Sequence, residues 1–497
     1  MYKKIKYFKW EKEGKRRYQI DVEKIFNSYN DADLNLEELR SKLNSLNKED
    51  VKELSNFYKK SNNILNRIDS FMYWTLNLNL DQKEDIIYNN NILYNKKINY
   101  LKECKKHLGK KDALLNSNLI LVDKDKEKYK SINKIFNPII LDLQNKIKCE
   151  SDKNKKLDLI IELEYEFYKL NKKLNNENIS LNYNPFYFPY DLMKQIIFEI
   201  EEKIYPFYIE CINEKKKRES NFIAKSISTK KMFSVLMDSL SILGSDYIKR
   251  IDNALSENRI DYFNRQYKKQ ENHAFYNRVS IMGILREKDL FILSHEITHM
   301  IEEEFKGTNY YINKNNIDRE TEIYAFISEY LSYEYFKNNK IDSNKFFTNE
   351  EIIFEFYARR IINLFNNIKT YNIILKMFKY FEQGKIDIKE QILNEDKEYI
   401  DMFLENVSTY NPYIHCIYII AEYTSRLIAD KIIKGEVSVE KYLDCLKDKS
   451  MKNLNLDNKY ANLKKYFNID VYDFNFSKMA IKKYFDEVEK IYNILKK

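Results

Sequence analysis

The chain has 497 residues, of which 85 are lysine or arginine and 76 are aspartate or glutamate, so its formal net charge at pH 7 is +9. With only 7 glycines and 5 prolines, the composition excludes a collagenous or disordered polymer and a loop-rich sandwich. The basic excess is small for this length, so we expect no nucleic-acid partner. We predict a mainly α-helical fold.

The location of the protein is indicated by its cysteines and its first residues. Five cysteines are scattered along the chain without any CxxC pair, which indicates reduced thiols and a cytoplasmic protein. The basic start, Met1-Tyr2-Lys3-Lys4, lacks the apolar run of a signal peptide. No window reaches the length that a bilayer-spanning helix needs, so we expect no membrane partner. The sequence does not indicate an oligomeric state.

Residues 30–180 are typical of successive long amphipathic helices. The segment 182–190 contains two of the five prolines and interrupts this pattern. We place a lobe boundary there, which divides the chain into an N-terminal helical lobe, 1–190, and a second lobe, 191–497. The same segment can also be a packed loop within one continuous fold.

A second departure from the helical pattern comes at residues 277–285. Loose alternation and several branched residues predict a strand there. Such a strand can offer a free backbone edge to an extended peptide, which would place Ser280, Met282 and Gly283 against a substrate. The alternative is a short strand that only packs.

The motif His295-Glu296-Ile297-Thr298-His299 follows this strand. Four residues are about one helical turn, so both imidazoles face one side of a helix and can hold one zinc ion. Glu296 lies beside the first histidine, where it can accept a proton from a water that zinc holds. Because the chain has only 5 histidines, a chance match has an expectation of roughly 0.01.

A catalytic zinc needs a third protein ligand. We expect this ligand on a second helix at 319–331, for which Asp318 is the N-cap. Glu322 is our choice, and Glu320 is the alternative. Glu329 lies two turns after Glu322 on the same face, and we expect it to support a zinc-bound histidine.

These segments resemble the oligoendopeptidase F and thimet oligopeptidase family. The resemblance rests on residues 279–283 leading into 289–299, and then on 322–329, in the order of the family's edge strand, zinc helix and glutamate helix. It implies a two-lobed helical fold around a deep central channel, a small sheet beside the zinc helix and one Zn²⁺. It also implies an oligopeptide substrate and the exclusion of folded proteins. Thr298 stands where members usually have glycine, and Glu302 where they often have a further histidine.

The resemblance also implies a tract of histidine and tyrosine, C-terminal to the zinc helices, that stabilises the oxyanion and grips the substrate. The matching segment is a helix that we predict to begin at Asn411-Pro412 and to end near Lys434-Gly435. Its candidate donors are His415, Tyr418, Tyr423 and, as an alternative, Tyr413.

Together, these residues predict a zinc metalloendopeptidase that cleaves short, unstructured oligopeptides. His295, His299 and Glu322 would hold Zn²⁺, and Glu296 would act as the general base. A helical zinc carboxypeptidase is the first alternative, because related carboxypeptidases share the two-helix zinc site. A helical binding protein without turnover is the second, although a metal held only for structure has little use for a carboxylate beside an open position.

Overall fold

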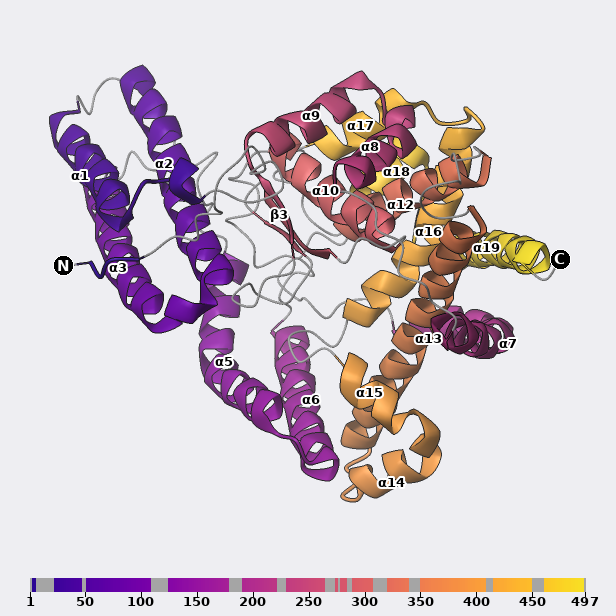
Figure 1. The fold of residues 1–497 in the computed structure, drawn as a ribbon. Coiled ribbons are helices and arrows are strands. Elements are labelled where there is room, and N and C mark those ends of the chain that lie inside the picture. Colours follow the sequence, from indigo (N-terminus) through magenta and orange to yellow (C-terminus); the bar gives the residue numbers. More distant parts are fainter. Residues whose placement is uncertain are drawn as a thin grey trace. The chain divides into compact units, whose positions relative to one another are not determined.

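The structure is a computed structural model, and it shows a mainly helical chain with one small sheet (Figure 1). The mainly α fold class predicted from the sequence is therefore confirmed. The residues that the structure describes are 2–5, 22–46, 51–108, 124–177, 190–220, 229–263, 273–275, 278–283, 288–306, 320–338, 349–407, 414–448 and 460–495.

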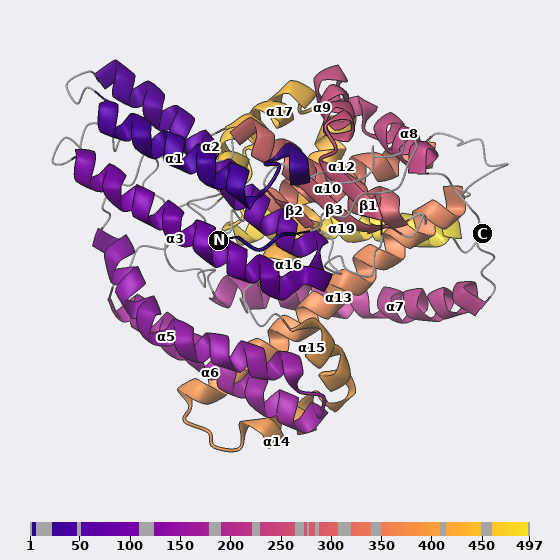
Figure 2. The ribbon, with the colours of Figure 1, turned by 60° about the vertical axis from the view of Figure 1, so that its left-hand side comes forward.

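The chain forms two compact units, and the first comprises residues 1–121 and 228–314. Its first three α-helices, which lie between residues 29 and 108, are side by side (Figure 2). They bury a shared core that includes Leu39, Trp74 and Leu93. The helices of this unit are η2 (Val22–Lys24), α1 (Tyr29–Ser45), α2 (Val51–Leu78), η3 (Leu80–Gln82), α3 (Lys83–Leu108), α8 (Thr229–Ser239), η5 (Ser241–Leu243), α9 (Ser245–Ser256) and α10 (Lys288–Lys306).

The sheet of this unit has the strand order β1-β3-β2. Its strands are β1 (Ile260–Phe263), β2 (His273–Phe275) and β3 (Arg278–Gly283). β3 is parallel to β1 and antiparallel to β2. The strand predicted at 277–285 is therefore confirmed.

The prediction that this strand has a free edge is wrong for its first residues, because β3 is the middle strand of the sheet. Ser280 lies opposite Asp261 of β1 on one side and His273 of β2 on the other. A buried strand needs partners for its backbone N–H and C=O groups, and both neighbours supply them here. At the start of β3, the Arg278 side chain donates a 3.2 Å hydrogen bond to Ser70 of α2.

The second unit comprises residues 122–227 and 315–497. Its centre is a helix, α12, that packs against α13 and α16 (Figure 1). The helices of this unit are α5 (Lys124–Cys149), α6 (Lys153–Asn176), α7 (Tyr190–Ser220), α12 (Glu320–Asn338), α13 (Asn349–Glu382), α14 (Ile388–Glu395), η6 (Lys397–Tyr399), α15 (Ile400–Asn406), α16 (Ile414–Ile433), α17 (Val439–Lys447), α18 (Ala461–Phe467) and α19 (Phe474–Leu495).

Helix α12 is buried on nearly every side. Apolar residues occur all round it, as in a helix at the centre of a large protein, so it has no broad solvent face. Polar contacts also hold it to its neighbours. The Ser425 hydroxyl of α16 donates to the Ile323 carbonyl at 3.0 Å, and the Tyr442 hydroxyl of α17 donates to the Tyr324 carbonyl at 3.1 Å.

The C-terminus of α16 forms as the sequence predicted. Gly435 has a positive φ of 71°, which a glycine adopts without steric cost. The Gly435 N–H donates to the Ile432 carbonyl at 3.0 Å, and the Glu436 N–H donates to the Lys431 carbonyl at 2.9 Å. This pair of bonds is a Schellman motif. The predicted start at Asn411-Pro412 lies outside the described residues.

The second unit contains residues on both sides of the lobe boundary that we predicted at residue 190. Helix α13 contacts α6, which precedes the boundary, and α7, which follows it. Tyr168 of α6 packs on Phe378 of α13 with ring centroids 5.8 Å apart, and Lys369 of α13 pairs with Glu201 of α7. The interrupting segment itself lies outside the described residues, and the two lobes and their channel stay predictions.

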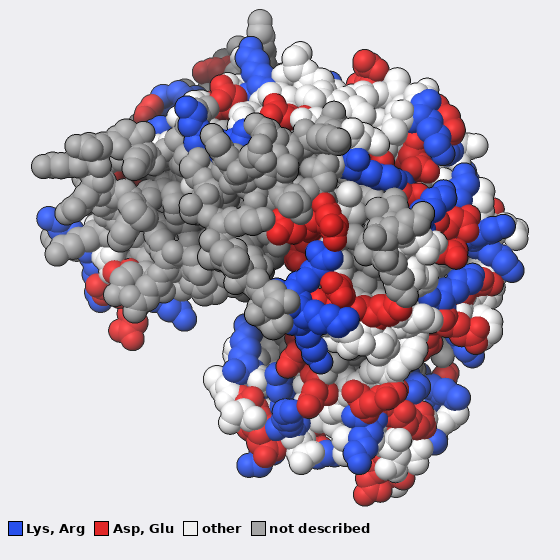
Figure 3. Space-filling model, turned by 45° about the vertical axis from the view of Figure 1, so that its right-hand side comes forward, with Lys and Arg blue, Asp and Glu red and all other residues white. Residues whose placement is uncertain are grey.

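Three further sequence predictions concern cysteines, membranes and surface charge. All five cysteines lie in described helices, and none of them forms a disulfide. Among the described helices, none is long and apolar enough to cross a membrane. Figure 3 shows basic side chains interspersed with acidic ones on the face that it draws.

Candidate metal site

The histidine motif lies in the middle of α10. The helix packs against β2, β3, α8 and α9 through a fully buried apolar face that includes Leu293, Ile297 and Met300. His295 and His299 lie on another side and are partly exposed. Burial of the apolar face therefore orients both imidazoles in one direction, as the spacing of four residues predicted.

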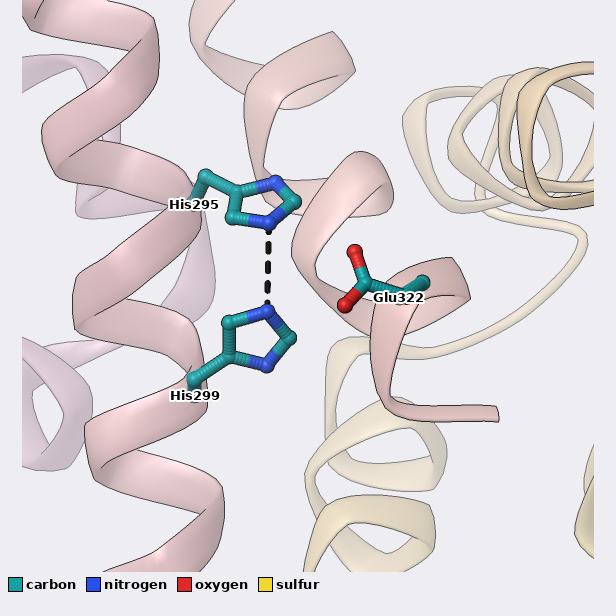
Figure 4. A group of neighbouring side chains, drawn as sticks. All are labelled: His295, His299 and Glu322. Atoms are coloured by element: carbon teal, nitrogen blue, oxygen red, sulfur yellow. Dashed lines mark hydrogen bonds between the residues drawn. The ribbon is translucent and has the colours of Figure 1, made fainter. Parts of the chain in front are cut away.

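The two imidazoles meet edge to edge. Their Nε2 atoms are 3.1 Å apart, and the ring centroids are 4.7 Å apart with an angle of 84° between the planes. Figure 4 shows the Glu322 carboxylate of α12 beside both rings. One ligand atom from each of the three residues lies within 4.8 Å of the others, so this group could hold a metal ion.

Glu320 and Glu322 both begin α12, but they have different partners. The Glu320 carboxylate is buried and accepts hydrogen bonds from the backbone N–H groups of Asn462 and Leu463, at 3.0 and 3.2 Å. It also accepts one from the Tyr324 hydroxyl at 2.6 Å. The first N–H groups of a helix have no partner within that helix, and Glu320 accepts two of them at the start of α18. Of the two candidates, Glu322 is the one grouped with the histidines.

Glu296, the predicted general base, follows His295 on α10 and is partly exposed. The predicted substrate residues lie on β3. Ser280 is buried in the middle of the sheet, with a strand on each side. Met282 and Gly283 lie at the end of β3, where Gly283 is opposite Phe263 of β1.

Glu329 has arginine partners in place of the histidine that the sequence suggested. It is fully buried and pairs with Arg359 and Arg360 of α13. Arg360 also pairs with Glu422 of α16 at 3.1 Å, and the Tyr330 hydroxyl donates to Glu422. Burial acts to lower the pKa of Arg360, but the two carboxylates outweigh it and raise that pKa above its ordinary value.

Sequence reasoning missed this buried ion-pair network. The signal was present in α13, where Arg359-Arg360 interrupts an otherwise apolar stretch, and in α16, where Glu422 does the same. A charged residue within an apolar helix is rarely buried unless it has a partner. The pattern therefore indicated a partner but could not say which helix supplied it.

The three donors proposed on α16 have separate surroundings. Nδ1 of the buried His415 donates to Asn367 Oδ1 of α13 at 2.7 Å, and burial lowers the pKa of His415 to about 4. The Tyr418 ring stacks on Phe326 of α12, with centroids 6.1 Å apart. The buried Tyr423 hydroxyl shares a 3.2 Å hydrogen bond with Ser477 of α19. Tyr413 lies outside the described residues.

Thr298 and Glu302, the two residues of α10 that differ from the pattern of the resemblance, both have buried partners. The buried Thr298 hydroxyl lies 2.8 Å from the Tyr247 hydroxyl of α9. Glu302 forms a fully buried pair with Lys306 of the same helix, at 2.5 Å.

Comparisons with known proteins found a similarity in structure. No protein-family model matches the sequence, and a search of curated proteins found no match. A search of solved structures found oligoendopeptidase-F from Enterococcus faecium, at 11% sequence identity and a TM-score of 0.41. The similarity covers 95% of this chain and 92% of that chain. The assignment of residues rests on α10 and α12 themselves.

Proposed function

We propose that the protein is a zinc metalloendopeptidase that hydrolyses internal peptide bonds of short, unstructured oligopeptides. The observation that carries this proposal is the convergence of His295, His299 and Glu322, whose ligand atoms lie within 4.8 Å of one another. Glu296 adds a carboxylate that directly follows the first histidine.

The donor set fits zinc. Two imidazole nitrogens and one carboxylate oxygen are a known ligand set for catalytic zinc, and three protein ligands leave one position open. Two nitrogens that bind zinc tetrahedrally at about 2.0 to 2.1 Å lie about 3.3 Å apart. The observed separation of the His295 and His299 Nε2 atoms, 3.1 Å, is close to that value.

In the proposed mechanism, His295, His299 and Glu322 would hold Zn²⁺. When bound, the ion lowers the pKa of a water toward about 7 and polarises the peptide carbonyl. Glu296 accepts the proton of the attacking water and passes it to the leaving amine. Attack on the carbonyl carbon forms the C–O bond first, and the C–N bond breaks once the amine nitrogen has received the proton from Glu296, so no external acid or base is needed.

Oxyanion stabilisation is assigned to Tyr418 ahead of the other two α16 candidates. Its ring stacks on Phe326, one turn from Glu322 on the same helix. Loss of an oxyanion donor typically costs about 3 to 4 kcal/mol in activation free energy.

The peptide-binding backbone is assigned to the end of β3. Among the described residues, β2 pairs with β3 at Arg278–Ser280. Met282 and Gly283 lie beyond that pairing, and Gly283 is opposite Phe263 of β1, so the substrate strand is proposed to add on the side of β2. Ser280 is left with a packing role, because strands lie on both sides of it.

The test is to incubate the purified, zinc-loaded protein with unstructured peptides of about 5 to 20 residues and to identify all products by mass spectrometry. Glu296→Gln is the matched control, because it keeps the side-chain shape and removes the base. Internal cuts that the control lacks are expected. Loss of single C-terminal residues would indicate a carboxypeptidase instead, and intact peptides would contradict the peptidase proposal.

A second measurement separates the metal from the base. Glu296→Gln is expected to retain zinc and to lose most turnover, whereas His295→Ala is expected to lose both. Zinc content is measured by elemental analysis alongside the peptide assay. His295→Ala with full zinc and normal activity would contradict the assignment of the metal ligands.

A further inference from the structure

We infer that Tyr247 is a positioning residue for the histidine pair: through Thr298 it holds the turn of α10 that presents His295 and His299. The inference deepens the proposed zinc site and rests on it. Tyr247 belongs to α9, which packs against α10. Tyr247 and Thr298 are both completely buried.

The direction of the hydrogen bonds follows from the number of hydrogens. The Thr298 hydroxyl donates to the Ser294 carbonyl at 2.8 Å. A threonine hydroxyl has only one hydrogen to donate, so it acts as the acceptor toward Tyr247. The Tyr247 hydroxyl, 2.8 Å away, is therefore the donor. The chain of bonds runs from Tyr247 through Thr298 to the backbone of α10.

These hydrogen bonds end next to the two candidate histidine ligands. Ser294 directly precedes His295, and Thr298 directly precedes His299. The bond between them therefore spans the same turn as the two imidazoles. A threonine hydroxyl that bonds to the carbonyl four residues earlier tends to bend a helix. An added donor from another helix fixes that bend, and with it the 3.1 Å separation of the two Nε2 atoms.

Two other polar anchors of α10 lie farther from the histidines. The buried Tyr262 hydroxyl of β1 donates to Asp289, which is six residues before His295 (295 minus 289). Six residues of helix span about 9 Å. At the other end of α10, Arg250 of α9 pairs with Glu304 at 3.2 Å. Tyr262 therefore provides a matched control: a buried tyrosine that bonds to the same helix away from the histidine turn.

The experiment compares Tyr247→Phe and Thr298→Val with Tyr262→Phe, using full-length protein. Zinc affinity is measured by competition with a chromophoric chelator, and ligand geometry by the visible absorption of the Co²⁺-substituted protein. Tyr247→Phe and Thr298→Val are expected to weaken zinc binding about 10-fold, as loss of a supporting contact typically does. Both are expected to change the Co²⁺ spectrum.

The control and the rescue distinguish positioning from general stability. Tyr262→Phe is expected to lower the melting temperature while leaving zinc affinity and the Co²⁺ spectrum unchanged. Thr298→Ser keeps the hydroxyl and is expected to retain the affinity that Thr298→Val loses. If Tyr247→Phe does not fold, the comparison of Thr298→Val with Thr298→Ser still tests the positioning role.

Two results would overturn the inference, and they differ in what else they overturn. Wild-type zinc affinity and an unchanged Co²⁺ spectrum in both Tyr247→Phe and Thr298→Val would remove the positioning role and leave the proposed function standing. A wild-type protein that binds no zinc would remove the proposed function and this inference together.

Discussion

Glu320 and Glu322 show how much the surroundings of a single residue decide. Two residues along a helix point to nearly opposite sides. Glu320 consequently reaches the start of α18, where it accepts from the backbone of Asn462 and Leu463. Glu322 faces the other way and is grouped with His295 and His299. The same side chain thus serves as a helix cap at one position and as a candidate metal ligand at the other.

Substitution of Glu322 should change zinc affinity, whereas substitution of Glu320 should change the stability of the fold. Glu322→Gln is expected to weaken zinc binding by more than about 100-fold, beyond the loss of a merely supporting contact. Glu320→Gln is expected to keep zinc but to destabilise the protein by about 1 to 3 kcal/mol, because charged hydrogen bonds to backbone N–H groups are lost. Chelator competition and urea unfolding measure the two effects. Loss of zinc from Glu320→Gln, with zinc retained by Glu322→Gln, would make Glu320 the metal ligand instead.

His415 is a buried imidazole that stays neutral in the folded protein at pH 7. Its Nδ1 donates to Asn367, and burial lowers its pKa from the ordinary value of 6.5 to about 4. Between these two pH values the unfolded chain binds more protons than the folded one. The contribution of His415 to stability is therefore complete above pH 6.5 and falls as the pH drops toward 4.

Substitution of this histidine should change the pH dependence of stability. The free energy of unfolding of the wild type, minus that of His415→Gln, is expected to shrink by about 3 kcal/mol between pH 7.5 and pH 4. Urea unfolding at several pH values measures the difference, and the comparison cancels groups that titrate in both proteins. A difference that does not vary with pH would show that the imidazole is not held neutral.

At the scale of elements, buried charges join three helices of the second unit. Glu329 of α12, Arg360 of α13 and Glu422 of α16 form consecutive ion pairs. The Arg360 guanidinium also lies 3.9 Å from the centre of the Phe326 ring, so its flat face is covered as well. Removing one member of such a network leaves the other charges buried without their partner.

Arg360→Met keeps a long apolar side chain and removes the charge. It is expected to destabilise the protein by about 3 to 5 kcal/mol, because Glu329 and Glu422 lose a buried partner. Lys153→Met is the control, since Lys153 pairs with Asp401 across α6 and α15 while both side chains are largely exposed. That substitution should leave the urea midpoint unchanged. Equal effects of the two substitutions would contradict the account of the network.

At the scale of the whole molecule, the candidate ligands come from two helices that are separated along the chain. His299 ends the motif on α10, and Glu322 follows 23 residues later on α12 (322 minus 299). A metal that binds the folded chain through both helices, and not the unfolded chain, stabilises the fold by mass action. None of the five cysteines forms a disulfide, so no covalent cross-link adds to this stabilisation.

Zinc should therefore change the melting temperature of the wild type. At a free zinc concentration 100 times the dissociation constant, the expected stabilisation is about 2.7 kcal/mol. Chelation should lower the melting temperature, and added zinc should restore it. His295→Ala is expected to show no response to either treatment. The melting temperature is followed by circular dichroism, and an equal response in His295→Ala would place the zinc effect elsewhere.

Local sequence patterns were sufficient for the features that form within one element. The spacing of His295 and His299 places both imidazoles on one side of a helix wherever that helix lies, and Gly435 ends α16 because only a glycine enters its conformation without steric cost. The long helices of residues 30–180 and the strand at 277–285 were likewise predicted from periodicity and composition. Each of these outcomes depends on neighbours within a few residues.

Tertiary structure alone decided which distant groups meet. The sequence showed β3 but not the two strands that cover it, and it showed Glu329 but not the arginines of α13 that pair with it. It likewise favoured Glu322 over Glu320 as the ligand but did not show that Glu320 bonds to the backbone of α18. Buried backbone groups and charges require partners, but many segments can supply them. The choice among those segments depends on how the helices pack, which no local pattern contains.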